Sequence, residues 1–295
     1  MGRSMPAILL GVCLVSHPAI AAEKTPASLP RITKWEMKYD EDSCSLLTQF
    51  AAGDNAVMMA VTRTAPGDWF EMRLYGKMLQ HGEIKMPLEV AFGDGAPIKR
   101  TAMSATAGID QKVAAAIIPG LRVDGWEWAS KMEANVLVPS VTAEQEAGIK
   151  SITFKPAGKG RYRLETGSMG APFAAMRTCT DDLVRHWGFD PAVEAKLSRR
   201  ATPKVSPAKW LGTNDFPLAA ASQGMNGYVK FRLDVDPDGN VAGCRILFRT
   251  DPDEFANASC RLLARRAKFQ PALDADGKPV KSYFVSSVTW LSASS

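Results

Sequence analysis

The chain has 295 residues, of which 46% are hydrophobic and 23% are charged, a composition that fits folded domains and excludes an intrinsically disordered chain. This length suffices for two domains. The formal net charge of +5 is small, and the basic residues of the chain are dispersed. Both features argue against a nucleic-acid-binding protein.

Residues 1–22 have the features of a secretory signal peptide. Arg3 supplies the positive start, residues 7–15 form an apolar core, and a small-residue cleavage site precedes a cut near Ala21 and Ala22. The apolar run is short for a membrane span of about 20 residues, and polar residues and a proline interrupt it. We therefore expect an exported protein whose mature chain has no stable membrane span. A retained membrane anchor is the alternative.

Residues 23–195 are predicted to form a β-rich domain of unknown family. Short segments of strand-like residues are separated by turn residues, as in an antiparallel sheet or a sandwich. These segments are residues 34–39, 44–50, 56–63, 69–75, 87–92, 113–123, 152–154 and 161–165. One amphipathic helix is predicted over residues 171–187, where Phe173, Met176 and Leu183 share a face and Gly188 is placed to end it.

Residues 196–207 are polar and interrupted by prolines, which predicts a linker to a second domain at residues 208–295. In that domain, residues 227–235 alternate apolar and polar side chains, as in a strand with one face in water. A turn and a second strand follow at residues 236–248, and then a helix that starts near Pro252 and a final apolar strand. The fold class predicted for the whole chain is α+β, with a small β-β-α-β domain after the β-rich one.

The second domain resembles the C-terminal domain of the TonB energy-transducer family over about residues 207–292. The features that carry the resemblance are Phe216-Pro217, the strand with its Asp238-Gly239 turn, Lys268-Phe269-Gln270-Pro271-Ala272, and Gly277-Lys278-Pro279-Val280 before the last strand. The resemblance implies a location in the periplasm of a Gram-negative bacterium. The long proline-rich spacer of a TonB-type transducer is not visible in this sequence.

The resemblance also implies how a partner is bound. In the family, an extended segment of another envelope protein, such as an outer-membrane receptor, adds as a strand near the C-terminal strand of the sheet. The residues expected to receive it are Tyr283, Phe284, Val285, Ser286 and Ser287. The alternatives are that this strand is central, or that the first domain or a second copy of the chain covers its edge.

Four cysteines lie outside the signal segment, and an even number in an exported chain favours disulfides. Pairing Cys44 with Cys179 and Cys244 with Cys260 keeps each bridge inside one domain, and this is the preferred pairing. Four buried free thiols are the alternative.

Neither a cofactor nor a metal site is expected. Residues 234–239 resemble the start of a calcium loop, but Arg245 stands where the bidentate glutamate is needed, so a turn is the better interpretation. His81 and His186 have no nucleophile motif beside them. The leading hypothesis is a periplasmic, non-enzymatic binding or scaffold protein. The alternatives are an energy transducer for outer-membrane transporters and an enzyme with its site in the first domain.

Overall fold

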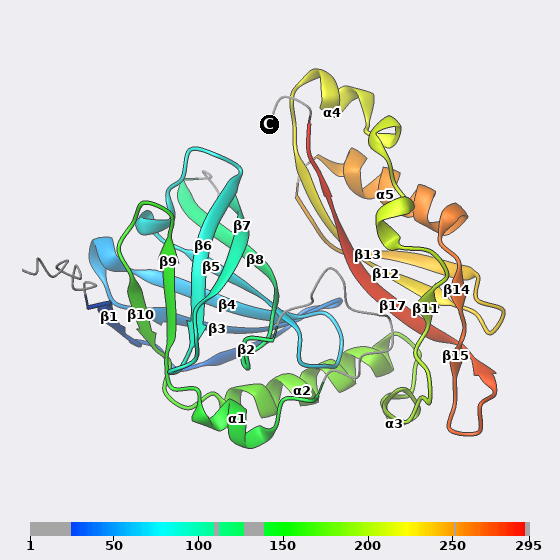
Figure 1. Ribbon diagram of the computed structural model, residues 1–295, viewed down its shortest axis with the longest axis horizontal. Coiled ribbons are helices and arrows are strands. Elements are labelled where there is room, and N and C mark those ends of the chain that lie inside the picture. Colours follow the sequence, from blue (N-terminus) through cyan, green and yellow to red (C-terminus); the bar gives the residue numbers. More distant parts are fainter. Residues whose placement is uncertain (1–24, 109–111, 127–138, 251, 293–295) are drawn as a thin grey trace, which may run out of the picture.

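The computed structural model describes residues 25–108, 112–126, 139–250 and 252–292. The predicted signal peptide lies outside these residues. The fold mixes α and β, with one large curled sheet and few helices, as Figure 1 shows. Among the described residues, no helix combines the length and the apolar character needed to cross a membrane.

The large sheet has ten strands in the order β1-β10-β9-β6-β7-β8-β5-β4-β3-β2. Every neighbouring pair is antiparallel except β1 and β10. The strands are β1 (Ala27–Pro30), β2 (Glu36–Tyr39), β3 (Cys44–Phe50), β4 (Val57–Arg63), β5 (Phe70–Tyr75), β6 (Lys85–Phe92), β7 (Ile98–Ala107), β8 (Val113–Leu121), β9 (Ile152–Pro156) and β10 (Tyr162–Glu165). Each predicted strand of this region has a counterpart, whereas β1 and β7 were not predicted.

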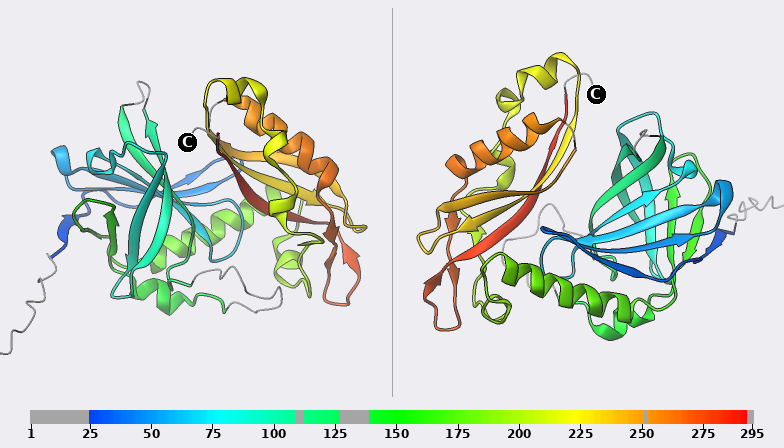
Figure 2. Two further views of the ribbon diagram at one scale, coloured as in Figure 1. Left: turned by 45° about the horizontal axis from the view of Figure 1, so that its top comes forward. Right: turned by 180° about the vertical axis from the view of Figure 1, so that it is seen from behind.

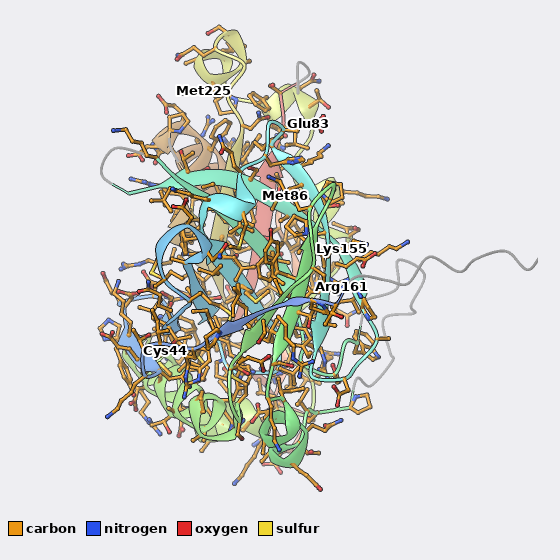
Figure 3. All side chains as sticks on the ribbon, turned by 90° about the vertical axis from the view of Figure 1, so that its left-hand side faces the viewer. Cys44, Glu83, Met86, Lys155, Arg161 and Met225 are labelled. Atoms are coloured by element: carbon orange, nitrogen blue, oxygen red, sulfur yellow. A yellow bond between two sulfur atoms is a disulfide. The ribbon has the colours of Figure 1, made fainter. Side chains whose placement is uncertain are left out.

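A helix closes one side of the large sheet (Figure 2). The predicted helix is α2 (Gly170–His186), and Phe173, Met176 and Leu183 on its buried face pack into the sheet's core. Gly188, with a φ of 80°, follows its end. The other helices of this region are α1 (Ala143–Gly148), α3 (Pro191–Ala195) and the short 3-10 turns η1 (Gly53–Asn55) and η2 (Lys77–Leu79). Figure 3 shows the side chains that fill the sheet, with the buried Met86 and Cys44 among them.

A second sheet of three strands has the order β13-β12-β17. Its strands are β12 (Gly227–Val235), β13 (Val241–Arg249) and β17 (Ser282–Trp290). α5 (Asp253–Arg266) covers one face, where Phe231 and Leu233 are buried. The smaller elements are β11 (Thr202–Pro203), η3 (Pro207–Lys209), η4 (Thr213–Asp215), α4 (Leu218–Ser222), β14 (Phe269–Gln270), β15 (Ala272–Leu273) and β16 (Pro279–Val280).

The turn between β12 and β13 has the geometry that its residues favour. Asp236 Oδ1 accepts the N–H groups of Asp238 at 3.0 Å and Asn240 at 2.8 Å. Gly239 has a φ of 83°, and a Cβ there would lie 2.0 Å from the Phe269 carbonyl oxygen. Only glycine fits this position.

Part of the predicted linker is hydrogen-bonded to the C-terminal part of the chain. β11 pairs with β14, with Thr202 opposite Gln270. Arg199 donates from its guanidinium to the carbonyl oxygen of Pro271 at 3.0 and 3.2 Å. These bonds attach the end of the predicted linker to the residues that follow α5.

Both preferred disulfide pairings are present. Cys44–Cys179 joins β3 to α2, with the Cα atoms 6.0 Å apart. Cys244–Cys260 joins β13 to α5, with the Cα atoms 5.6 Å apart. Each bridge therefore connects a strand to the helix that covers its sheet.

Candidate functional site: the free edge of β17

β17 is an edge strand of the three-stranded sheet. It pairs with β12 without a register shift, from Trp290 opposite Gly227 to Ser282 opposite Val235. Within the described ranges, no other strand pairs with it. Figure 1 shows β17, in red, along one side of this sheet. One side of its main chain is therefore without a strand partner.

Two hydrogen bonds at the start of β12 show which main-chain groups of β17 point to the free edge. Thr250 N–H donates to Tyr228 O at 3.0 Å, and Tyr228 N–H donates to Thr250 Oγ1 at 2.9 Å. The main-chain N–H and C=O of Tyr228 therefore point toward β13. Those of Val229 point toward β17, because the direction of these groups alternates along a strand. Val288 lies opposite Val229, so its N–H and C=O point inward. By the same alternation, the N–H and C=O groups that point to the free edge belong to Tyr283, Val285, Ser287 and Thr289.

The other edge of this sheet, β13, is less suited to receive a strand. Its pairing with β12 shifts register between Lys230 and Phe231 and again between Asp234 and Val235. Such bulges twist an edge and interrupt its hydrogen-bonding pattern, and they are one of the features that protect edges from pairing. β17 carries no such interruption, so its edge is the regular one.

Most of the predicted partner-binding residues have side chains with other contacts. Tyr283 is buried, and its ring centroid lies 5.3 Å from those of both Trp187 and Phe189. Phe284 packs against Phe269, with the centroids 5.2 Å apart, on the side of α5. Val285 and Ser286 are half-buried, and Ser287 is exposed. Among these five residues, the groups available to a partner are mainly the outward N–H and C=O groups of Tyr283, Val285 and Ser287.

The start of β17 and the residue before it are held by the segment that follows α2. Lys281 Nζ donates to the Gly188 carbonyl oxygen at 3.2 Å, and Ser282 Oγ donates to Glu194 Oε2 at 3.0 Å. Burial raises the pKa of the Glu194 carboxyl, although the Ser282 hydroxyl opposes that shift. The part of the edge left for a partner therefore begins after these residues, toward Val285 and beyond.

Glu194 predicts a specific pH dependence. Because its pKa is higher in the folded than in the unfolded chain, the folded state keeps a proton that the unfolded state loses as pH rises above the usual glutamate value. Stability is therefore expected to fall as pH rises from the unfolded to the folded pKa, and then to level off. The Glu194→Gln variant stays neutral and is expected to lack this fall in urea unfolding between pH 4 and 7. Parallel curves for the two chains would contradict the prediction.

The second face of the three-stranded sheet is covered by the large sheet, and one prediction is wrong here. Lys230 and Arg232 were predicted to lie on a face in water, but both are largely buried. The Arg232 guanidinium lies 4.4 Å from the ring centroid of Trp187, at the end of α2. A period-two pattern shows that polar side chains share a face, but it does not show what packs against that face.

At the centre of this contact, the Glu71 carboxylate lies under β12. Glu71 is 1% exposed, and its Oε1 accepts from Arg73 Nη2 at 2.6 Å. Its Oε2 accepts from the Tyr228 hydroxyl at 3.0 Å and lies 3.9 Å from Lys230 Nζ. Burial lowers the pKa of Lys230 against the attraction of Glu71, and burial together with Glu71 raises the pKa of Tyr228. The sequence signal was a polar Glu71 and Arg73 two residues apart in an otherwise apolar strand.

A further contact joins the β2–β3 turn to β13. Arg245 donates from Nε to Asp42 Oδ2 at 3.0 Å, and it also pairs with Glu41. Arg245 is the residue that occupied the last position of the calcium-like pattern. Its side chain pairs instead with two carboxylates from the large sheet's first hairpin.

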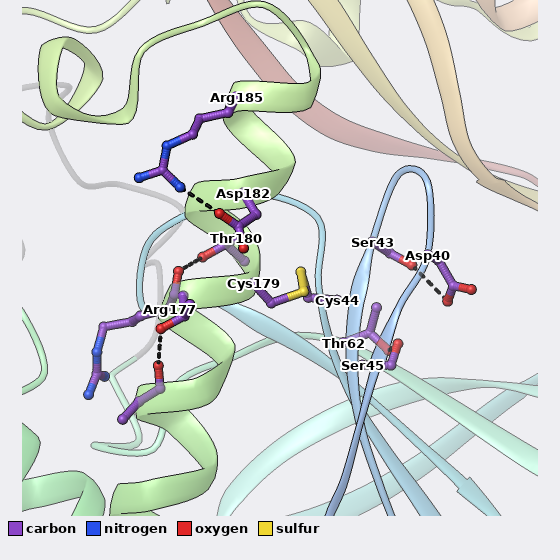
Figure 4. The surroundings of a disulfide bond; sticks show 12 residues. Asp40, Ser43, Cys44, Ser45, Thr62, Arg177, Cys179, Thr180, Asp182 and Arg185 are labelled. Atoms are coloured by element: carbon purple, nitrogen blue, oxygen red, sulfur yellow. Dashed lines mark hydrogen bonds and ion pairs between the residues drawn. A yellow bond between two sulfur atoms is a disulfide. The ribbon is translucent and has the colours of Figure 1, made fainter.

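One cavity near α2 is lined by His186, one of the two histidines considered in the sequence analysis. It has a volume of about 410 Å³, and its lining includes His186, Asp182 and the Cys44–Cys179 bridge. Figure 4 shows the bridge between β3 and α2 and the ion pair of Asp182 with Arg185, at 2.6 Å. His81 does not line this cavity. Because both sulfur atoms are bonded to each other, the cavity has no free thiol to act as a nucleophile.

The fold and this edge define a class of protein: a small sheet under a helix, with one regular free strand, packed on a larger sheet. Residues 213–290 match the family model of the Gram-negative bacterial TonB protein C-terminal. The predicted resemblance is thereby confirmed for a segment of the chain that includes β12, β13, α5 and β17. Comparisons with curated proteins and with solved structures found no match.

Proposed function

We propose that this protein is a non-enzymatic binding or scaffold protein of the periplasm, which receives an extended segment of another envelope protein at β17. The observation that carries the proposal is the regular edge of β17, on which Val285, Ser287 and Thr289 direct their N–H and C=O groups away from β12. Main-chain hydrogen bonds supply affinity in this mode of recognition, and neighbouring side chains supply specificity.

Two further observations support this location and this kind of partner. Two disulfides suit an oxidising compartment outside the cytosol. The match of residues 213–290 to the TonB C-terminal family favours TonB-like interactions between envelope proteins. An outer-membrane receptor is one partner of this kind.

Proline substitutions at two neighbouring residues of β17 test the proposal. The N–H of Val285 points to the free edge, so Val285→Pro is expected to remove a donor for the partner while β12 keeps its bonds. The N–H of Ser286 points to β12, so Ser286→Pro is expected to cost about 3 kcal/mol or more of unfolding free energy. The measurements are urea unfolding and capture of partners by crosslinking of the full chain in periplasm.

Val285→Pro is expected to reduce the crosslinked partner at least about ten-fold while its urea midpoint stays close to that of the unchanged chain. Unchanged capture by a folded Val285→Pro chain would refute strand addition at this edge. Equal destabilisation by the two prolines would show that the assignment of inward and outward N–H groups is wrong.

The second candidate is energy transduction to outer-membrane transporters, which the family match favours. It requires that the N-terminal segment anchors the chain in a membrane. We expect the mature protein to start near Ala22 and to be recovered from the soluble periplasmic fraction. Intact residues 1–21 in a membrane fraction, found by N-terminal mass analysis, would favour transduction instead.

A further inference from the structure

A row of side chains crosses the outer face of the large sheet and extends from beneath β12 toward the free edge of β17. In the register, Arg73 lies opposite Ile117, Ile117 opposite Met103, and Met103 opposite Lys85. Residues directly opposite each other point to the same face of a sheet, so these four side chains share one face. The Arg73 end is covered, since its guanidinium lies 4.0 Å from the ring centroid of Phe248 on β13.

A cavity of about 210 Å³ lies between this row and the C-terminal end of β17. The large sheet lines it with Lys85, Met103, Ile117 and Pro119, and the other wall includes Tyr228, Thr289 and Leu291. Sites for small-molecule ligands usually have about 300–1,000 Å³. This cavity is smaller than that range, but it has room for one side chain.

The orientation of β17 connects this cavity to an added strand. Thr289 lines the cavity, and its N–H and C=O point to the free edge. The residue of an incoming strand that lies opposite Thr289 must direct its side chain to the same face, which is the face toward Met103. The cavity is also continuous with the contact between the two sheets, because Tyr228 takes part in both.

The chemistry of the walls specifies the occupant. Met103 and Ile117 make the floor apolar, so a polar side chain there would lose its hydrogen bonds to water. Lys85 stands at the rim as an exposed cation, and among the described residues it has no ion pair. A carboxylate next to the apolar side chain complements that charge.

We propose that the large sheet supplies a side-chain pocket for the strand that β17 receives. Its occupant is an extended segment of a partner protein with a branched aliphatic residue opposite Thr289 and a carboxylate within reach of Lys85. This inference rests on the proposed strand addition, and it assigns a role in specificity to the N-terminal part of the chain.

A displayed library of random heptapeptides, selected on the full chain, is the probe. Peptides that the Val285→Pro chain rejects define strand addition, and these are resynthesised with leucine, alanine or lysine at the enriched position. Leucine is expected to bind about ten-fold or more tightly than alanine, because about three buried carbon atoms distinguish them. An acidic residue beside it is expected to be enriched as well.

Three variants of the large sheet separate this pocket from the edge. Met103→Glu places a charge in the pocket, and Thr101→Trp fills it from an exposed position that also lines it. Both are expected to abolish the preference for leucine while binding that depends on Val285 persists. Lys85→Glu is expected to remove the preference for an acidic residue. Val113→Glu, at an exposed position of β8 that does not line the cavity, is the matched control and should change neither preference.

The outcomes are distinguishable. A leucine preference that survives in folded Met103→Glu and Thr101→Trp chains would overturn the pocket and leave strand addition intact. Selected peptides that show no preference for an apolar residue at the position opposite Thr289 would also overturn the pocket and leave strand addition intact. If no peptide is selected that Val285→Pro rejects, strand addition itself fails, and the pocket is rejected with it.

Discussion

Replacing Glu71 with alanine is expected to lower the free energy of unfolding by about 3–5 kcal/mol, which is the usual result when one partner of a buried ion pair is removed. Glu71 is 1% exposed and contacts three polar groups, those of Arg73, Tyr228 and Lys230. Without it, the buried ammonium group of Lys230 has no counter-charge. Urea unfolding followed by tryptophan fluorescence measures the loss.

A double-mutant cycle identifies the cause. Lys230→Met removes the cation that Glu71→Ala leaves unpaired, so the double variant is expected to be more stable than Glu71→Ala alone. Glu165→Ala, which removes one partner of a half-exposed pair with Arg163, is the control and should cost about 1 kcal/mol or less. A loss of similar size for Glu71→Ala and Glu165→Ala would mean that the two sheets do not pack through Glu71 in solution.

The Cys44→Ala, Cys179→Ala double variant is expected to lose about 5 kcal/mol. The bridge joins residues 135 positions apart in the sequence, and in the chain-entropy model the stabilisation grows with the length of the closed loop. Removing Cys244 and Cys260, which are 16 positions apart, is expected to cost about 3 kcal/mol. Urea unfolding of the variants, with and without dithiothreitol, measures both effects.

The reductant provides the internal control for this pair of variants. Dithiothreitol should destabilise the unchanged chain and should have a smaller effect on each double variant, because one bridge is already absent. If reduction leaves the unfolding curve of the unchanged chain in place, the four cysteines are free thiols in the isolated protein. That result would also remove an argument for export.

The two sheets together give the candidate site its form. The three-stranded sheet provides the free main chain of β17. The large sheet covers its second face through Glu71 and the Asp42 contact with Arg245, and Trp187 at the end of α2 packs on the same face. With that face covered, the regular edge of β17 is the part of the three-stranded sheet that is left for a partner strand. A partner strand would therefore meet main-chain groups from one sheet and side chains from the other.

Local patterns predicted the elements well where apolar residues recur at a fixed period. α2 begins at Gly170 and β12 spans Gly227–Val235, both within one residue of the prediction. β7 was missed because small and charged residues such as Lys99, Arg100 and Ser104 give it little apolar alternation. Its neighbours β6 and β8 determine it by pairing with it on both sides.

The sequence by itself determined the strands and the helix of the C-terminal segment and the family resemblance, because each of these depends on residues a few positions apart or on their identity alone. The preferred cysteine pairing followed from the predicted boundary between the domains, since it keeps each bridge inside one domain. Only the tertiary structure decided that β17 lies at an edge, that its outward groups include Val285 and Thr289, and that Lys230 and Arg232 are covered. The physical reason is that alternation fixes which side chains share a face. What packs on that face is decided by strands such as β5, more than 150 positions earlier in the chain, as the Tyr228 contact with Glu71 shows.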